Sequence, residues 1–261
     1  MVVMNISEHG ALHGMTYGCW AMGEFGLPRP ARFHGQFGED WFCWELLGRP
    51  RIGYFVEAGA YNGVDLSTTL GLQDCGWRGV LVEPLVEAYE KLVMARSDRR
   101  PMRPGDTAAV CVNAALVGPD DPPTWRMRVS DHEVYGGMTS GVVPETEETL
   151  TWEEREVPTT TLGALHERYL KPYGARVDVL FLDVEGGEMR ALRGLGGMEP
   201  RIICAEDLSL TKGGECFQGL EMYMRIERPV YVEFARVGYN RVYVHREMLD
   251  AAKKRFHGME A

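Results

Sequence analysis

Acidic residues stand at the ends of several apolar runs in this sequence, where their carboxylates could serve in ligand binding or catalysis. They are Glu57, Glu83, Asp183 and the adjacent pair Glu206 and Asp207. A carboxylate in such a place can accept hydrogen bonds from ribose hydroxyls, ligate a hard cation or act as a general base. If the apolar runs are parallel strands, their carboxyl ends meet at one crevice, where α/β folds bind ligands. The sequence therefore predicts one site, built from acids that lie far apart along the chain.

A glycine turn follows the first of these acids. Residues 54–63 read Tyr-Phe-Val-Glu-Ala-Gly-Ala-Tyr-Asn-Gly, the layout of a buried strand, a tight turn and a helix start. Gly59 lets the backbone come close to a ligand because it carries no Cβ. Glu83 stands roughly 20 residues after Gly63, where nucleotide-binding folds place the acid that holds the ribose. Together, Glu57, Gly59 and Glu83 indicate a cofactor that contains adenosine.

Strands and helices are expected to alternate along most of the chain. Apolar runs predict strands at residues 53–57, 79–83, 108–112, 114–117, 124–129, 177–183, 201–207 and 240–244. Periodic or capped segments predict helices at residues 36–48, 64–74, 86–96, 161–169, 186–193, 229–237 and 247–256. For residues 229–237 a helix is favoured by Pro229 at its first position and Gly238 just past its end. This alternation predicts an α/β fold with a mostly parallel sheet and helices on both faces.

Two stretches break the alternation. Residues 1–35 are expected to form an irregular N-terminal arm or cap, followed by one domain over residues 36–261. Within that domain, residues from about 119 to 156 read as an insertion with a polar loop, the natural place for a segment that covers a site.

The composition limits the classes of partner. Lys and Arg number 28 against 38 Asp and Glu, and the net charge of −10 disfavours nucleic-acid binding. We interpret the arginine-rich residues 96–103 as a solvated helix end and loop. Six scattered cysteines without a CxxC pair predict a reducing compartment and no structural zinc. With no signal-peptide pattern and no bilayer-length apolar run, we expect a cytoplasmic protein without membrane contact; whether it forms a homo-oligomer is left open.

Several motifs, in order, resemble the FkbM family of S-adenosylmethionine-dependent methyltransferases. They are Gln36-Phe37-Gly38-Glu39-Asp40, Phe55-Val56-Glu57-Ala58-Gly59-Ala60 with Asn62-Gly63, Ser67-Thr68-Thr69, Gly76-Trp77-Arg78-Gly79-Val80-Leu81-Val82-Glu83-Pro84, Asn113-Ala114-Ala115-Leu116, Asp183-Val184-Glu185-Gly186-Gly187-Glu188 and Gly238-Tyr239. The resemblance spans roughly residues 36–244. Thr68 stands where the family usually has Asn, and the 119–156 insertion is a second departure.

The resemblance implies a class I methyltransferase (Rossmann-like) fold with a late antiparallel strand and S-adenosylmethionine as cofactor. It implies that Glu57, Gly59, Asn62 and Gly63 line the methionine end of the cofactor and that Glu83 takes the ribose hydroxyls. Asn113 and Ala114 would border the adenine. The remaining residues of the implied cofactor-binding set are Ala60, Ser67, Pro84 and Asp183.

Methyl transfer to a hydroxyl also needs a base or a metal. Asp183, Glu206 and Asp207 offer hard oxygen ligands for Mg²⁺ at neighbouring strand ends, as in related sugar and catechol O-methyltransferases. Alternatively, Asp183 orients the cofactor amine or a turn, and Asp207 caps a loop. Asp183 and Glu185 are our predicted catalytic residues, and His132 in the insertion is a further choice of base.

The sequence thus predicts an O-methyltransferase that acts on a hydroxyl of a sugar, a glycan or a polyhydroxylated small molecule. Two alternatives stay open at this point: an NAD(P)-dependent oxidoreductase, and a non-catalytic binding module of the same fold. The spacing of Gly59 and Gly63 lacks the GxGxxG pattern, which disfavours the oxidoreductase.

Overall fold

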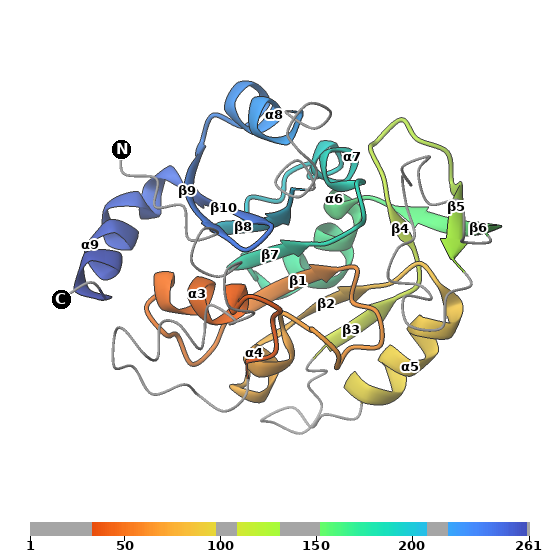
Figure 1. The fold of residues 1–261 in the computed structure, drawn as a ribbon, viewed down its shortest axis with the longest axis horizontal. Helices are drawn as coiled ribbons and strands as arrows, with labels where there is room; N and C mark the ends of the chain where they lie inside the picture. The colour runs from red at the N-terminus through yellow and green to blue at the C-terminus, as the bar shows by residue number, and fades with distance from the viewer. Residues whose placement is uncertain (1–32, 98–108, 131–151, 208–218, 260–261) are drawn as a thin grey trace.

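A seven-stranded sheet forms the centre of the computed structural model, which describes residues 33–97, 109–130, 152–207 and 219–259 (Figure 1). Its spatial order is β3-β2-β1-β7-β8-β10-β9. Five neighbouring strands are parallel: β1 (Tyr54–Ala58), β2 (Arg78–Val82), β3 (Ala109–Val112), β7 (Val179–Leu182) and β8 (Ile202–Glu206). Strand β10 (Asn240–His245) runs antiparallel to both β8 and β9 (Tyr231–Val237). The predicted class I methyltransferase fold, with a mostly parallel sheet and one late antiparallel strand, is confirmed.

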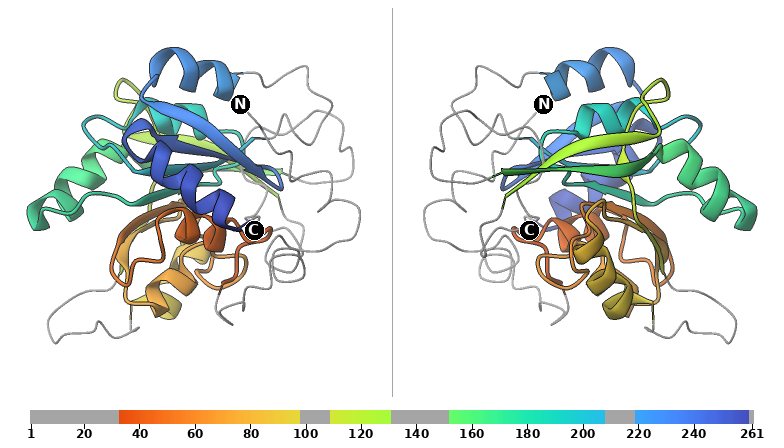
Figure 2. Two further views of the ribbon diagram at one scale, coloured as in Figure 1. Left: turned by 90° about the vertical axis from the view of Figure 1, so that its left-hand side faces the viewer. Right: turned by 90° about the vertical axis from the view of Figure 1, so that its right-hand side faces the viewer.

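Helices cover both faces of this sheet because its central strands are apolar on both sides. Successive residues of a strand point to opposite faces, so Phe55 and Val56 belong to two separate core clusters. The Phe55 side is covered by α3 (Glu39–Leu46), α4 (Leu70–Asp74), α5 (Val86–Arg96) and α9 (Leu249–Met259). The Val56 side is covered by α6 (Leu162–Leu165), α7 (Glu188–Arg193) and α8 (Gly219–Glu227). Figure 2 shows the two helical layers on either side of the sheet.

The predicted insertion contributes to a second, three-stranded sheet. Strand β6 (Trp152–Thr160) lies between the short β4 (Ala115–Leu116), to which it is parallel, and β5 (Thr124–Ser130), to which it is antiparallel. Val129 of β5 is buried against Leu85 and Ala88 at the start of α5. Arg155 of β6 forms a 2.7 Å ion pair with Glu87 of α5. The β5–β6 pair is therefore docked against the start of α5, beside the carboxyl end of β2.

Two predicted helices differ from the structure. Residues 229–237 do not form a helix; most of them are strand β9, and the helix α8 ends just before Pro229. Tyr231, Val232, Phe234 and Val237 are β-branched or aromatic, and pairing with β10 outweighs the helix-start signal of the proline. The helix predicted at residues 64–74 begins only at Leu70, because residues 64–69 form turns that reach Glu57.

Further observations concern a helix cap, the cysteines and the segments that the structure does not describe. Thr161 caps α6, and its side chain accepts a hydrogen bond from the Ala164 amide at 3.1 Å. Within the described ranges no cysteine forms a disulfide, and no helix has the length and apolar character needed to cross a bilayer. Most of the predicted N-terminal arm, and His132, lie outside the described residues.

Candidate active site

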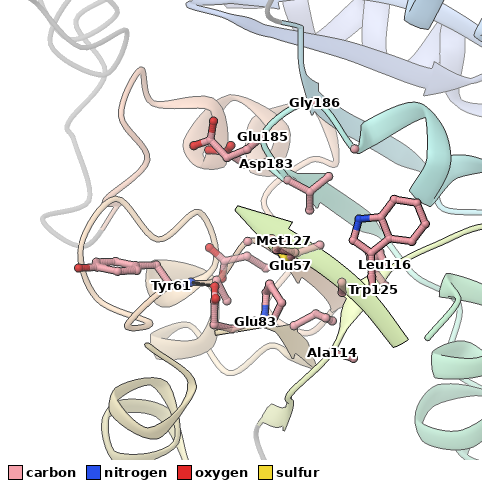
Figure 3. Close-up of a pocket in the computed structure, with 18 of the residues that line it drawn as sticks. Glu57, Tyr61, Glu83, Ala114, Leu116, Trp125, Met127, Asp183, Glu185 and Gly186 are labelled. Atoms are coloured by element: carbon pink, nitrogen blue, oxygen red, sulfur yellow. Dashed lines mark hydrogen bonds between the residues drawn. The ribbon is translucent and has the colours of Figure 1, made fainter. Parts of the chain in front are cut away.

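A cavity of about 470 Å³ opens at the carboxyl ends of β1, β2 and β7, where the acids were predicted to meet (Figure 3). Its volume lies within the range of small-molecule sites. Nine of the predicted site residues line it: Glu57, Gly59, Ala60, Ser67, Glu83, Pro84, Ala114, Asp183 and Glu185. The structure thus gathers residues from both halves of the chain around one cavity.

The turn after β1 presents backbone to this cavity. Gly59 has φ +81°, a left-handed conformation that side chains disfavour. A Cβ at this position would lie 1.7 Å from the Asp183 carbonyl oxygen. The amides of Gly59 and Ala60 both donate to the Val82 carbonyl, at 3.0 and 3.1 Å. The glycine is therefore required because the turns after β1 and β7 are in backbone contact.

Glu83 is buried at the end of β2, with an exposed fraction of 3%. One of its carboxyl oxygens accepts a 2.9 Å hydrogen bond from the Tyr61 amide, and the other accepts one of 2.9 Å from the Leu85 amide. Burial raises its pKa to about 7, against the lowering effect of these two hydrogen bonds. The carboxyl group is held in place at the cavity wall, and each oxygen retains a lone pair for a ligand hydroxyl.

Glu57 lies at the centre of a buried hydrogen-bond network. Its carboxylate accepts hydrogen bonds from the Ser67 and Thr69 hydroxyls and from the amide and hydroxyl of Thr68. Arg96 Nη1 lies 3.8 Å from Glu57 Oε2 and donates to Ser67 Oγ at 2.9 Å. Glu57 therefore lines the cavity and also fixes the 67–69 turn, of which Ser67 lines the cavity too.

Arg96 contradicts the interpretation of residues 96–103 as a solvated end. Its side chain is fully buried and also donates to the Gly63 carbonyl at 3.0 Å and to Thr69 Oγ1 at 3.0 Å. A charge run is usually solvated, but the partners of Arg96 lie about 30 residues earlier in the sequence, so local composition could not reveal them. The other residues of that stretch up to Arg103, apart from Ser97, are outside the described part of the chain.

Three predicted cofactor residues do not line the cavity and instead support its walls. The Asn62 side-chain oxygen accepts from the Val64 and Asp65 amides at 3.0 and 2.9 Å. Gly63 has φ +76° and accepts the hydrogen bond from Arg96. Asn113 donates from Nδ2 to the carbonyls of Glu83 and Pro84, at 2.9 Å each. Asn113 thereby ties the end of β3 to the end of β2.

Asp183 stands between the large cavity and a second one of about 50 Å³. The small cavity is also lined by Glu39, Glu206 and Asn240, and it shares Glu57 and Gly59 with the large one. The side chain of Asp183 is solvent-exposed through these cavities, but the protein atoms packed around its carboxyl group partly desolvate the charged form. This desolvation, more than the nearby charge of Glu57, raises the pKa of Asp183 to about 6.

Glu206 is hydrogen-bonded to Asp183, and burial together with the Asp183 charge raises the pKa of Glu206 to about 9. The two carboxyl groups therefore titrate as a pair, and their burial and mutual charge favour one shared proton over two negative charges. The Glu206 Oε2 atom is buried and has no hydrogen-bond partner among the described residues.

The predicted magnesium ligands are not assembled. The Asp207 carboxylate accepts a hydrogen bond from Nε of Arg241, whose Nη1 also binds Glu233 at 2.8 Å. Asp207 directly follows Glu206, so the alternation of an extended chain turns it away from Asp183. Across the described ranges no three His, Cys, Asp or Glu side chains are grouped to hold a metal. The donor set thus does not fit the expected magnesium site.

Glu185 and Glu188 occupy different places in the loop after β7. Glu185 lines the cavity with φ +54°, an uncommon conformation for a residue other than glycine. Glu188 is buried and accepts from the amides of Val184 and Gly186 at 3.0 and 3.2 Å, so it holds the loop. Burial raises the pKa of Glu188 to about 7.

Strand β5 forms a wall that the site prediction lacks. Trp125 and Met127 are on the face of β5 that carries the buried Val129, and both line the cavity. Trp125 and Leu116 lie across the cavity from Tyr61 (Figure 3). The alternation Trp-Arg-Met-Arg-Val in the insertion was the available signal, because it indicates a strand with one apolar face.

Comparison with known proteins gives one family. The model of the methyltransferase FkbM domain matches residues 57–251. A search of curated proteins finds no match.

Solved structures give distant likenesses. The O-methyltransferase TomG from Streptomyces achromogenes, involved in tomaymycin synthesis and solved in complex with SAM, is 12% identical, with 91% of this chain and 94% of that chain covered and a TM-score of 0.40. The SAH-bound methyltransferase PaMTH1 from Podospora anserina is 13% identical, with 99% and 88% covered and a TM-score of 0.36. At these scores neither likeness bears on substrate.

Proposed function

This chain belongs to the FkbM methyltransferase family, and from that membership and the two cavities we propose that it transfers the methyl group of S-adenosylmethionine to a hydroxyl of a sugar, a glycan or a polyhydroxylated small molecule. The family membership makes the chain an S-adenosylmethionine-dependent methyltransferase, and the oxidoreductase alternative is not retained. The acceptor class and the transfer to oxygen are the proposal.

The fit of the large cavity to the methyl donor supports this function. Glu83 offers a fixed carboxyl for the ribose hydroxyls, and the turn at Gly59 presents backbone to the cavity. The end of the cavity at Ala114, Leu116 and Trp125 is apolar, as the faces of an adenine ring require. The methionine end would then lie near Gly59 and Asp183.

The observation that carries transfer to oxygen is that Asp183 lines both cavities. Methyl transfer is an in-line displacement, so the acceptor oxygen must approach the methyl group from the side away from the sulfur. An acceptor hydroxyl entering from the small cavity would meet the Asp183 carboxylate, which can take its proton. The unpartnered Oε2 of Glu206 could accept a hydrogen bond from a second hydroxyl of a polyhydroxylated acceptor.

No step in this proposal passes through a metal. Of the three expected magnesium ligands, Asp207 is held by Arg241 instead. The acidic net charge disfavours a nucleic-acid acceptor. We also propose that the protein acts in the cytoplasm, which the lack of disulfides among the described cysteines supports.

The test is a methyl-transfer assay across saccharide and polyol acceptors, with and without EDTA. We expect transfer to a hydroxyl that persists in EDTA. An Asp183→Asn variant should lose about 100-fold or more in kcat, the usual contribution of a general base. The matched control is Glu90→Gln on the exposed side of α5. Transfer at the parental rate by Asp183→Asn would show that Asp183 is not the base, and transfer only to amines would refute the acceptor class.

A further inference from the structure

The β5–β6 hairpin places an aromatic side chain at the cavity in a defined position. The Arg190 guanidinium lies 3.9 Å from the centroid of the Trp125 ring, close enough for a cation–π interaction. Arg190 also pairs with Asp121 at 3.6 Å, and Asp121 accepts from the Gly118 amide at 2.8 Å. One face of the indole is thus occupied by Arg190 of α7. Helix α7 follows the loop that begins at Asp183 after β7.

This contact joins two parts of the chain that the fold does not otherwise require to meet. Trp125 belongs to the insertion, whereas Arg190 belongs to the helix after β7. The hairpin is held a second time at Val129 and Arg155, against α5. Because the hairpin contacts both α5 and α7, the position of β5 at the cavity is fixed by these packing contacts.

The surroundings of Trp125 indicate what it would contact. The part of the cavity wall on and beside β4 consists of Ala114, Ala115, Leu116 and Val117, and none of these side chains has a hydrogen-bonding group. Three arginines, Arg126, Arg128 and Arg190, also line the cavity. The carboxylates that line the cavity come from other elements: Glu57 is in β1, and Asp183 directly follows β7. A polyhydroxylated acceptor needs polar partners, whereas a purine base presents two apolar faces.

From these contacts we infer that Trp125, positioned by Arg190, is an adenine-binding residue of the cofactor site, so that the insertion and not only the central sheet determines affinity for the methyl donor. This inference rests on the proposed cofactor site but does not depend on which acceptor the enzyme uses. Arg190 also lines the cavity, and its role in this inference is to position the indole.

Isothermal titration with S-adenosylhomocysteine tests the inference without any acceptor. A Trp125→Ala variant should bind about 5- to 150-fold more weakly, the range found when a base loses its aromatic partner. The same loss is expected for 5′-methylthioadenosine, which keeps the adenine and lacks the amino-acid end. Trp125→Phe should lose less than Trp125→Ala. Arg190→Met should lose about 2- to 5-fold, in keeping with an exposed cation–π contact.

Thr124→Ala, an exposed change on the same strand, is the matched control and should leave the affinity unchanged. Thermal melting of each variant establishes whether it is folded. If Trp125→Ala does not fold, the affinity of Trp125→Phe is used to test the role of Trp125. Unchanged affinity of a folded Trp125 variant for both ligands would overturn the inference. A higher KM for the acceptor with unchanged affinity for S-adenosylhomocysteine would also overturn it and would assign Trp125 to the acceptor. If no hydroxyl acceptor is ever methylated, the proposed function fails while the titration result stands.

Discussion

The affinity for the cofactor should depend on pH through Glu83. This carboxyl is 3% exposed, and burial raises its pKa to about 7. Ribose hydroxyls donate hydrogen bonds, so they favour the ionised carboxylate over the protonated acid. The binding-competent form of Glu83 is therefore only partly populated at neutral pH.

The expected magnitude follows from this pKa. At pH 6 about one molecule in ten carries an ionised Glu83, and at pH 8 about nine in ten do. Affinity for S-adenosylhomocysteine should therefore be about tenfold weaker at pH 6 than above pH 8. In a Glu83→Gln variant the side chain is uncharged and does not ionise between pH 6 and pH 8. At pH 8 it should bind about 10- to 150-fold more weakly than the parent, the range for hydrogen bonds to a charged group.

The assay is isothermal titration from pH 5.5 to 8.5 for the parent, Glu83→Gln and the exposed control Glu90→Gln. A glutamine offers only one acceptor oxygen, so either the Tyr61 or the Leu85 amide loses its partner. The free energy of unfolding of Glu83→Gln should then be about 1–3 kcal/mol lower than that of the parent. The titration must therefore be run below the melting temperature of this variant.

The comparison between variants decides the matter. If Glu83 is the titrating group, the affinity difference between the parent and Glu83→Gln should shrink about tenfold on going from pH 8 to pH 6. If both proteins show the same pH dependence, another group is responsible, and the assignment of Glu83 to the ribose is wrong.

Two further predictions concern stability. Arg96→Met should lower the free energy of unfolding by about 3–5 kcal/mol, because Glu57 would remain buried without its cation; a loss below 1 kcal/mol in urea unfolding would refute this. Stability should also fall as pH rises from about 5 to 8, because burial raises the pKa values of Glu39 to about 8 and Glu188 to about 7, so the folded chain binds more protons than the unfolded one. Melting temperatures measured across this range should decline in the parent and decline less in Glu39→Gln, and a rise with pH would contradict the assignment.

The central sheet and the turn after β1 were predictable because their signals are local. An apolar run, an acid and glycines at short spacing are enough to define β1 and the turn at Gly59. The errors arise where the deciding partner is distant in sequence. Strand β9 forms because residues 231–237 pair with β10, and this pairing overrides Pro229 and Gly238.

Site residues follow the same rule. Acids at strand ends were correctly expected to meet, but the sequence could not show that Arg241 would take Asp207 or that Arg96 would be buried under Glu57. Trp125 was missed because its role depends on where the insertion docks. The apolar alternation in β5 predicts a strand, but not which cavity the strand covers.

The contact between Gly59 and the Asp183 carbonyl has a consequence for how such an enzyme can diversify. Main-chain atoms on both sides fix the separation between the turn at Gly59 and the Asp183 backbone, so side-chain substitutions cannot change it. Family members that use other acceptors would then keep the contact between Gly59 and the Asp183 carbonyl and differ in the segments around it. We expect substitutions that alter substrate range to accumulate in those outlying segments, while Gly59 tolerates no replacement.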